Sequence, residues 1–398
     1  MRARGLLRPD DGAAWRYHVG MRDWLAEAKQ LHAECAVLDG HADTPQRFVD
    51  EDFQWTSAEL GLGQLSAETA RQGGLRGGFL IAWPEPVEWV GRAAERTLSL
   101  IAAVHDQALR HADALAVCTS VAQVRAAMAA GRYAALIGVE GGHAIENSLD
   151  TLRQFHAAGA RYMTLTWANA NDWCGSSGAG ARADGLTDFG REVVREMNRL
   201  GMIVDVSHVS DAAFADVLLT SSAPVIASHS SARALCGAAR NVTDDMASAL
   251  AAQGGMVMVN FFAAFLSDRW RADWNTQRDE REAAVDAVRA GFRTRGVPIP
   301  FHAEMKVERE FARRIDPVPF SVLIDHFDHL LHVAGIDHVG IGSDFDGIPL
   351  GPQGIESAAD LPAITAALLH RGWQPHELRG MLGENLLRVM AAVEAHAA

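Results

Sequence analysis

Short apolar runs rich in β-branched residues recur along the chain and alternate with amphipathic helical patterns. The runs lack strict alternation of apolar and polar residues, which is typical of strands that are buried on both faces. Eight such strands are predicted, at residues 36–38, 78–83, 134–139, 161–167, 202–206, 224–227, 255–261 and 338–342. The helical pattern between them predicts helices that include residues 87–109, 149–157, 187–200, 211–219, 244–252, 320–333 and 375–393.

Eight strand–helix repeats favour a closed (β/α)8 TIM barrel, an α/β fold with parallel strands. A doubly wound open sheet is the alternative, but no GxGxxG motif follows the first strand, which weakens its dinucleotide-binding version. The interval 263–319 is polar and charged, and we expect a helical insertion there, either a lid over the barrel mouth or a surface excursion. No linker or repeat divides the sequence, so residues 1–398 are expected to form one domain.

Composition and charge narrow the range of partners. The chain has 398 residues, of which 48% are hydrophobic and 22% charged, so it can bury a sizeable core. Its 36 Lys and Arg against 50 Asp and Glu give a formal net charge of -14, which argues against nucleic acid as a partner. The four cysteines form no CxxC pair, residues 1–30 show no secretory signal, and no run of about 18 apolar residues predicts a membrane span. A cytoplasmic protein without a membrane partner is therefore expected.

Polar side chains gather where the predicted strands end. His41 and Asp43 follow the first strand, Glu140 the third, His208 the fifth and His229 the sixth. The carboxyl ends of parallel barrel strands meet at one rim, which is where active sites of this fold lie. Imidazole and carboxylate donors without thiolates suit zinc or a similar divalent ion. Each residue alone is more often structural, so the repeated placement at strand ends carries the prediction of a metal site.

The number of these candidate ligands points to two metal ions. Five ligands exceed the usual three of a mononuclear catalytic site, whereas two ions about 3.5–4 Å apart that share Glu140 would use all of them. Water held between two cations becomes a hydroxide nucleophile near neutral pH. Asp344 follows the eighth strand and is predicted to take the proton from that water and pass it to a leaving group.

Several motifs around these residues are shared with a known family. They are DGHAD at 39–43, GVEGGHAIENSL at 138–149, DVSHVSD at 205–211, SHSSARAL at 228–235, RNVTDD at 240–245, MVNFF at 258–262, GSDFDG at 342–347 and ENLLRVM at 384–390. With them the sequence resembles the membrane (renal-type) dipeptidases and their soluble bacterial relatives, zinc peptidases with an amidohydrolase-like barrel. The resemblance covers most of the chain, from about Leu38 to the C-terminal helix.

The resemblance implies two zinc ions and a set of residue roles. One ion would take His41, Asp43 and Glu140, and the other would take Glu140, His208 and His229. Asp344 matches the family's catalytic acid/base. The resemblance therefore implies hydrolysis of a dipeptide by a hydroxide that bridges the two ions.

Arg240 matches the family's arginine for the terminal carboxylate of the substrate, a role that suits the bidentate guanidinium group. A carboxylate clamp beside the metals would leave no room for a longer C-terminal extension, which implies short substrates. Without the resemblance, Arg240 would be interpreted as a surface residue that caps a helix or pairs with Asp244 or Asp245. The oligomeric state stays open, and a homodimer is the state that relatives suggest.

One position departs from the family pattern. Renal-type members carry a His at the end of the fourth strand that helps to hold the substrate carbonyl, whereas this chain has Trp167, which donates only through its indole N–H. Two interpretations follow: either Trp167 or Asn169 binds the substrate and stabilises the oxyanion, or the substrate is another small amide, such as an N-acyl amino acid, a lactam or a D-residue dipeptide. A metal-binding barrel without turnover is a further alternative, against which the intact Asp344 argues.

Overall fold

The computed structural model describes residues 23–297 and 299–397, and its strands form one closed barrel with an additional strand at its edge. The strands are β1 Leu38–Ala42, β2 Gly77–Ala82, β3 Leu115–Val117, β4 Tyr133–Glu140, β5 Ala160–Thr164, β6 Ile203–Asp205, β7 Val225–Ala227, β8 Met256–Val259 and β9 Val339–Ile341. Their order is β2-β1-β9-β8-β7-β6-β5-β4, and parallel pairing of β2 with β4 closes the ring. The predicted TIM barrel is confirmed and the open sheet is excluded. The prediction that residues 1–30 hold no secretory signal falls mostly on residues 1–22, which lie outside the described part of the chain.

β3 is a strand that the apolar pattern did not predict. It pairs with the first half of β4, where Leu115 lies opposite Tyr133 and Val117 opposite Ala135. The second half of β4 instead pairs with β5, beginning at Ile137. β3 therefore adds to the edge of the ring and leaves the barrel with eight strands.

Side chains of the barrel strands alternate between two cores. Phe79 and Ile81 point into the barrel, where they join buried residues from strands all around the ring, such as Leu136, Ile226 and Met258. Leu80 and Ala82, one residue along in each case, belong to the core between barrel and helices. Strands buried on both faces explain why the sequence shows continuous apolar runs.

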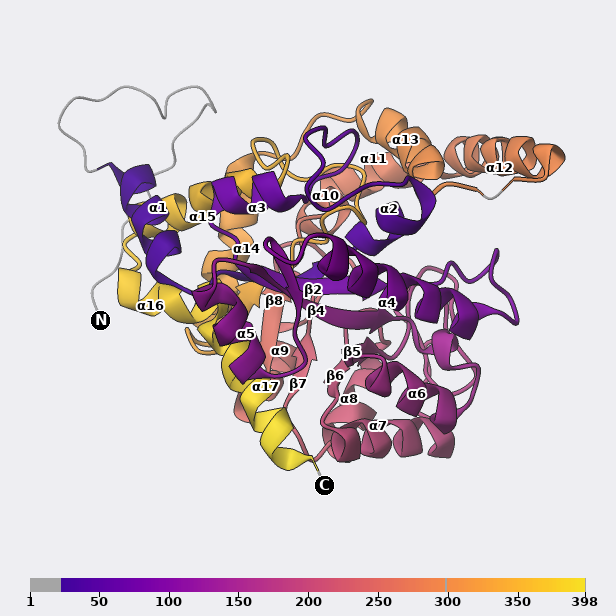
Figure 1. Ribbon diagram of the computed structural model, residues 1–398, viewed down its shortest axis with the longest axis horizontal. Helices are drawn as coiled ribbons and strands as arrows, with labels where there is room; N and C mark the ends of the chain where they lie inside the picture. Colours follow the sequence, from indigo (N-terminus) through magenta and orange to yellow (C-terminus); the bar gives the residue numbers. More distant parts are fainter. Residues whose placement is uncertain (1–22, 298, 398) are drawn as a thin grey trace.

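Helices surround the barrel (Figure 1). They are α1 Trp24–Glu34, α2 Thr44–Asp50, α3 Ala67–Gly73, α4 Ala93–Arg110, α5 Val121–Ala129, α6 Leu149–Ala157, α7 Asp188–Leu200, α8 Asp211–Thr220, α9 Asp244–Ala252, α14 Phe320–Val333, α15 Leu361–His370, α16 Pro375–Arg379 and α17 Asn385–His396, with 3-10 turns η2 Gly142–Ile145 and η3 Ala358–Asp360. Helices α6 to α9 all begin after a Ser or Thr whose side chain accepts a hydrogen bond from the first turn. In the described part of the chain, no helix has both the length and the apolar character needed to cross a bilayer.

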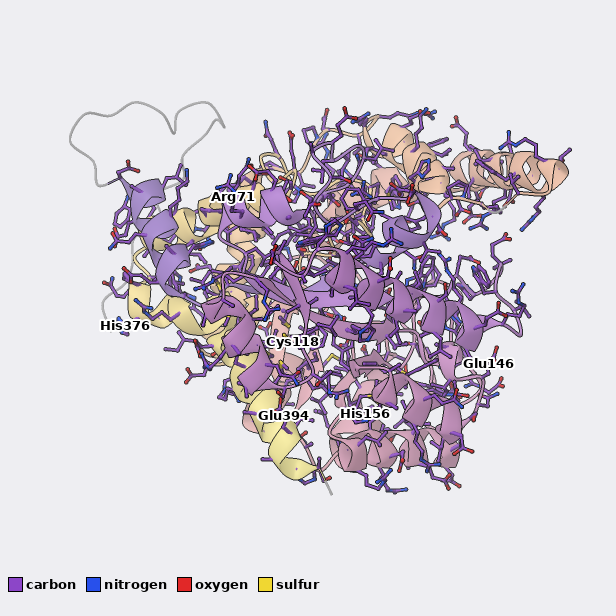
Figure 2. All side chains as sticks on the ribbon, in the orientation of Figure 1. Arg71, Cys118, Glu146, His156, His376 and Glu394 are labelled. Carbon is purple, nitrogen blue, oxygen red and sulfur yellow. The ribbon has the colours of Figure 1, made fainter. Side chains whose placement is uncertain are left out.

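The helix predicted at 375–393 is interrupted. The π-helical turn η4 Gly380–Glu384 separates α16 from α17. The chain bends at Gly383, whose dihedral angles are not helical, and a Cβ atom there would lie 2.2 Å from the carbonyl oxygen of Ala36, so only glycine fits this close to β1. Beyond the bend, the apolar face of α17 packs against the inner core and covers one end of the barrel. Glu394, labelled in Figure 2, accepts a hydrogen bond from the backbone N–H of Val121 (2.8 Å) and joins α17 to α5.

The interval 263–319 forms helices that follow β8. They are α10 Ala263–Leu266, α11 Asp268–Thr276, α12 Arg278–Arg295 and α13 Phe301–Ala312. Figure 1 shows α12 projecting away from the barrel. Arg289 lies 3.6 Å from Glu85, and Arg293 pairs with Glu88, so two ion pairs join α12 to the loop between β2 and α4. The choice between a lid and a surface excursion stays a prediction, as does the single-domain boundary.

Candidate metal centre

The structure brings the five predicted metal ligands and the predicted acid/base to the carboxyl ends of the barrel strands. Strands β1, β4, β6, β7 and β9 supply them, either within the last two residues of the strand or within the first few residues that follow. Two groups have ligand atoms that all lie within 4.8 Å of one another: His41, Glu140 and His229, and His41, Asp43 and Asp344. His208 joins the first group through its Nε2 atom, 3.0 Å from that of His229.

Glu140 lies between two sets of donors. Its Oε1 atom is 3.0 Å from His208 Nε2 and 3.3 Å from His229 Nε2. Its Oε2 atom is 3.7 Å from His41 Nε2, which is in turn 3.5 Å from Asp43 Oδ2. Each carboxylate oxygen therefore faces a different donor set, which is the arrangement that a bridging ligand requires.

The spacing of these donors suits zinc. Two ligand atoms bound tetrahedrally at about 2.0–2.1 Å from one zinc ion lie about 3.3 Å apart, and the observed separations run from 3.0 to 3.7 Å. His41 Nε2 is also buried without a hydrogen-bond partner. Buried polar atoms are normally satisfied, so an unpartnered nitrogen among carboxylates fits a position that faces a cation.

The protonation states of His208, His229 and Glu140 suit metal binding. His41 differs, because its burial is outweighed by the charges of Glu140 and Asp43, which raise the pKa of this imidazole well above its usual value, so a metal ion would have to displace its proton. Burial, helped by the charge of Arg240, lowers the pKa of His208 to about 4, and burial with the charge of His41 lowers the pKa of His229 well below its usual value. Burial opposes ionisation of Glu140, but the charge of His41 and the close approach of the His208 and His229 imidazoles hold the pKa of its carboxyl well below the ordinary range. Neutral imidazoles and an ionised carboxylate are the forms that ligate metals.

Asp344 lies beside this cluster in a constrained position. Its Oδ2 atom accepts a hydrogen bond from Asn260 Nδ2 (2.9 Å), and burial raises the pKa of its carboxyl group. A Cβ atom on Gly347 would lie 2.1 Å from Asp43 Oδ2 and 2.5 Å from Asp344 Oδ1. Glycine at 347 therefore allows both carboxylates to enter the site, and a raised pKa makes the Asp344 carboxylate a better proton acceptor.

Arg240 is a buried cation without a carboxylate partner. Its side chain donates from Nη1 to Ser230 Oγ (2.6 Å) and from Nη2 to the carbonyl oxygen of His229 (2.7 Å), while its buried Nε has no partner. The residue is 8% exposed, and burial lowers the pKa of its guanidinium to about 10. Among the described residues it forms no ion pair, so the surface pairing with Asp244 or Asp245 is not observed.

The two residues predicted to replace the strand-four His differ in placement. The ring of Trp167 lies 6.5 Å from that of His208 and 4.8 Å from that of Trp83, measured between centroids. Asn169 donates to the carbonyl oxygen of Ala170 (3.5 Å), and nowhere in residues 23–297 and 299–397 does it find a hydrogen bond to a predicted ligand. The structure therefore places the Trp167 ring near a proposed ligand, and substrate binding by Trp167 or Asn169 stays a prediction.

Four polar residues behind the ligands were not predicted as part of the site. They are Tyr162, Asp205, Ser228 and Asn260, all fully buried. The hydroxyl group of Tyr162 lies 2.8 Å from His41 Nδ1, and Ser228 Oγ lies 2.7 Å from His229 Nδ1. Asp205, Ser228 and Asn260 stand inside the shared family motifs, which could have identified them. Tyr162 stands inside an apolar run, where nothing in the sequence marks it as part of the site.

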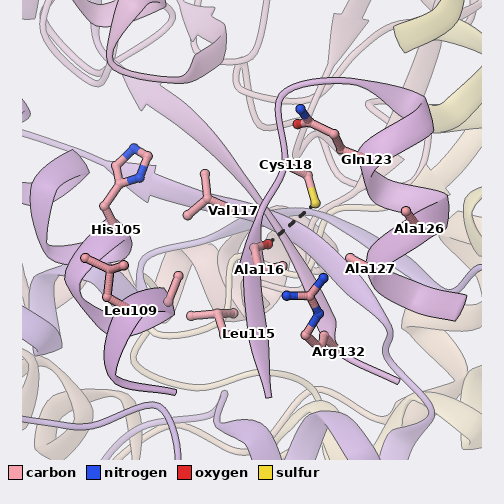
Figure 3. A pocket seen from close by; sticks show the side chains of 11 residues that line it. His105, Leu109, Leu115, Ala116, Val117, Cys118, Gln123, Ala126, Ala127 and Arg132 are labelled. Atoms are coloured by element: carbon pink, nitrogen blue, oxygen red, sulfur yellow. Dashed lines mark hydrogen bonds between the residues drawn. The ribbon is translucent and has the colours of Figure 1, made fainter. Parts of the chain in front are cut away.

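A separate hollow of about 430 Å³ lies between α4, β3 and α5 (Figure 3). Its wall includes Cys118, whose Sγ donates to the carbonyl oxygen of Ala116 (3.5 Å) and whose pKa is raised to about 11 by burial. The hollow contains none of the predicted ligands. The convergence of ligands, rather than the size of a hollow, therefore locates the candidate site.

A closed (β/α)8 barrel with a histidine–carboxylate cluster at its carboxyl rim defines a metal-dependent hydrolase as the class of protein. Residues 25–398 match the family model described as membrane dipeptidase (peptidase family M19), and the chain therefore belongs to the membrane dipeptidase family. The family makes the chain a metallopeptidase and a dipeptidase, as the sequence motifs implied.

Individual relatives agree with this assignment. Human Dipeptidase 3 is 32% identical over 382 residues, which cover 94% of this chain and 68% of that protein. The crystal structure of the probable dipeptidase PvdM from Pseudomonas aeruginosa is 25% identical, with a TM-score of 0.79 over 94% of this chain and 99% of that one. A metallopeptidase from Rhodobacter sphaeroides, bound to a phosphinate mimic of L-Ala-D-Ala, is 26% identical, with a TM-score of 0.72 over 90% of this chain and 99% of that one. The predicted cytoplasmic location and homodimer stay predictions.

Proposed function

We propose that this chain hydrolyses dipeptides with two zinc ions, one held by His41, Asp43 and Glu140 and the other by Glu140, His208 and His229. The two carboxylate oxygens of Glu140 lie near different donors, which supports Glu140 as the ligand that both ions share. When bound, the two ions would supply a bridging hydroxide as nucleophile and would polarise the scissile carbonyl group.

The buried guanidinium of Arg240 carries the assignment of a short substrate. A charge that is buried without a counter-ion is costly, and an incoming carboxylate would remove that cost. Arg240 is hydrogen-bonded to the backbone of His229, whose side chain is a proposed ligand. Adjacent residues of a peptide are about 3.8 Å apart, and a clamp attached to the backbone of a proposed ligand suits a scissile bond that is the last peptide bond of the substrate.

Asp344 would move the proton. Its carboxyl group is partly buried beside Asp43 and has a raised pKa, so it can accept a proton from the nucleophile. Release of that proton to the nitrogen of the breaking peptide bond yields a neutral amine as leaving group. Asn260 holds one oxygen of Asp344 during both transfers.

Asp344→Asn tests this role and separates it from metal binding. The variant is expected to retain the metal content of the wild-type protein and to lose at least about 10²-fold in kcat, because the amide cannot accept the proton. Metal content by elemental analysis and turnover of a dipeptide are measured on the same preparation. Hydrolysis at the wild-type rate would remove Asp344 from the reaction.

A dipeptide with a D-residue at its C-terminus is the second candidate substrate. Trp167 at the metal centre and the L-Ala-D-Ala mimic bound to the Rhodobacter relative both favour this alternative. A panel of L,L-dipeptides, L,D-dipeptides, N-acyl amino acids and lactams at equal concentration distinguishes the substrate classes. Two bound zinc ions with no hydrolysis of any member would instead support the non-catalytic barrel.

A further inference from the structure

We propose that Asp205 and Ser228 form a hydrogen-bonded relay that fixes the ring orientation and tautomer of His229, which makes them positioning residues for one of the two zinc ions. The inference rests on the binuclear site proposed above. Asp205 ends β6, and Ser228 immediately follows the neighbouring strand β7. Both residues are fully buried.

The hydrogen bonds around Asp205 determine where the hydroxyl hydrogen of Ser228 lies. Asp205 Oδ1 accepts from the backbone N–H groups of Ser207 and Ser228, both at 2.9 Å. Asp205 Oδ2 accepts from Thr164 Oγ1 (2.9 Å) and Ser228 Oγ (2.5 Å). Four donors occupy the four lone-pair positions of a carboxylate, so Asp205 is an acceptor throughout and the Ser228 hydroxyl donates to it.

The direction of that bond sets the tautomer of His229. Ser228 Oγ lies 2.7 Å from His229 Nδ1, and its single hydrogen is already directed at Asp205. The oxygen must therefore accept a hydrogen bond from Nδ1–H. A neutral imidazole with its hydrogen on Nδ1 has its free lone pair on Nε2, and Nε2 is the atom that lies 3.3 Å from Glu140 Oε1.

A second Asp–Ser pair on the barrel provides a matched control. Asp39 accepts hydrogen bonds from the backbone N–H of Ser343 (2.9 Å) and from the Ser343 hydroxyl group, which joins β1 to β9. Ser343 also contacts the carbonyl oxygen of His41 (3.4 Å), a backbone atom rather than an imidazole. The two pairs thus share residue types, burial and a role in joining strands, but Ser228 alone of the two serines contacts the ring of a proposed ligand.

Mutation of a residue that is hydrogen-bonded to a ligating histidine typically lowers metal affinity by about 10- to 100-fold. Metal-free wild-type protein and the variants Ser228→Ala and Ser343→Ala are titrated with zinc against a chromophoric chelator, and thermal melts of the metal-free proteins report their stability. Ser228→Ala is expected to keep one site unchanged and to bind the other zinc ion about 10- to 100-fold more weakly. Ser343→Ala is expected to bind both ions as the wild type does.

Asp205→Asn provides a stricter variant because it preserves size. The asparagine NH2 would donate to Ser228 Oγ, which reverses the hydroxyl so that it donates to His229 Nδ1 and moves the ring hydrogen to Nε2. Nitrogen-15 spectra of the imidazoles, with the His229 signal identified from a His229→Gln variant, are expected to show the Nδ1–H tautomer in metal-free wild type and the Nε2–H tautomer in Asp205→Asn.

Unchanged zinc affinity in both Ser228→Ala and Asp205→Asn, or an equal loss in Ser343→Ala, would overturn the relay. A wild-type spectrum with the hydrogen on Nε2 would also overturn it. A wild-type protein that binds fewer than two zinc ions contradicts the proposed binuclear site instead, and the spectra still decide the relay because they are recorded without metal. If Asp205→Asn fails to fold, the zinc affinities of Ser228→Ala and Ser343→Ala decide the relay: a selective loss in Ser228→Ala supports it, and equal affinities overturn it.

Discussion

Replacement of Arg240 by methionine should reduce activity without reducing stability, a combination that a purely structural arginine would not give. The guanidinium is buried, has no carboxylate partner among the described residues, and keeps its Nε without a hydrogen bond. Methionine has a similar length and no charge. The substitution therefore removes the proposed carboxylate clamp and also removes a charge that the folded state holds at a cost.

The size of both effects follows from the structure. Burial lowers the pKa of Arg240 from 12.5 to about 10, so at neutral pH the folded protein carries this charge at a cost of about 3 kcal/mol. Methionine relieves this cost, but it also loses the hydrogen bonds to Ser230 and His229, and each lost bond destabilises the folded state by about 1 kcal/mol. The free energy of unfolding is thus expected within about 1 kcal/mol of the wild type. Loss of a charge-assisted bidentate pair with substrate costs about 3 kcal/mol, which is about 10²-fold in kcat/KM.

The assay pairs each enzyme with two substrates, a dipeptide and the same dipeptide with its carboxylate replaced by an amide. The wild type is expected to prefer the dipeptide by about 10²-fold, and Arg240→Met is expected to cleave the two at similar rates. Urea unfolding of both proteins measures stability. An equal loss of kcat/KM on both substrates would refute the clamp, and destabilisation by more than about 3 kcal/mol would show that Arg240 is structural.

Two further predictions concern Trp167 and a buried histidine. Trp167→His should raise kcat/KM for L,L-dipeptides by about 10²-fold through a donor near the substrate carbonyl, whereas Trp167→Phe should not; equal kcat/KM in the two variants would show that the missing donor is unimportant. His326 accepts from Ala232 N (3.0 Å) and bonds Leu266 O (3.1 Å), and burial lowers its pKa from 6.5 to about 4. Between about pH 6.5 and pH 4 the unfolded chain binds a proton at His326 that the folded protein does not bind. The free energy of unfolding is therefore highest above about pH 6.5 and falls by about 3 kcal/mol as the pH falls to about 4. Urea unfolding between pH 8 and 4.5 measures this, and an identical pH dependence in His326→Gln would exclude His326 as its source.

The fold was predictable where burial and topology act together. Strands buried on both faces give continuous apolar runs, and repeated alternation with helices leaves the parallel barrel as the favoured arrangement. The short strand β3 gave no such signal because two of its three residues are half-buried at the edge of the ring. The predicted helix at 87–109 begins at Ala93, because residues 84–92 form turns at the mouth of the barrel.

The ligands were predictable for the same reason, since barrel topology gathers strand ends that are far apart in the sequence. Arg240 was different: nothing in RNVTDD shows that the guanidinium is buried, and without a family resemblance a surface ion pair is the ordinary interpretation. Ser228 precedes His229 in the sequence, but the direction of its hydrogen bond depends on Asp205 from another strand. Hydrogen-bond direction requires every donor around the carboxylate to be counted, and a sequence pattern does not contain that count.

Backbone geometry links the site to the loops around it. His208 and Asp344 both have left-handed φ angles, of 72° and 64°, and such conformations cost about 1–3 kcal/mol each in residues other than glycine. Each is held from outside its own strand: Ser177 N donates to the carbonyl oxygen of His208 (2.8 Å), and Asp344 N donates to that of His41 (3.0 Å). The loop after β5, which departs from the family pattern at Trp167, therefore supports a ligand on the next strand as well as lining the site. Changes in that loop should alter both the affinity for zinc and the choice of substrate, because the loop holds His208 through Ser177 and also carries Trp167.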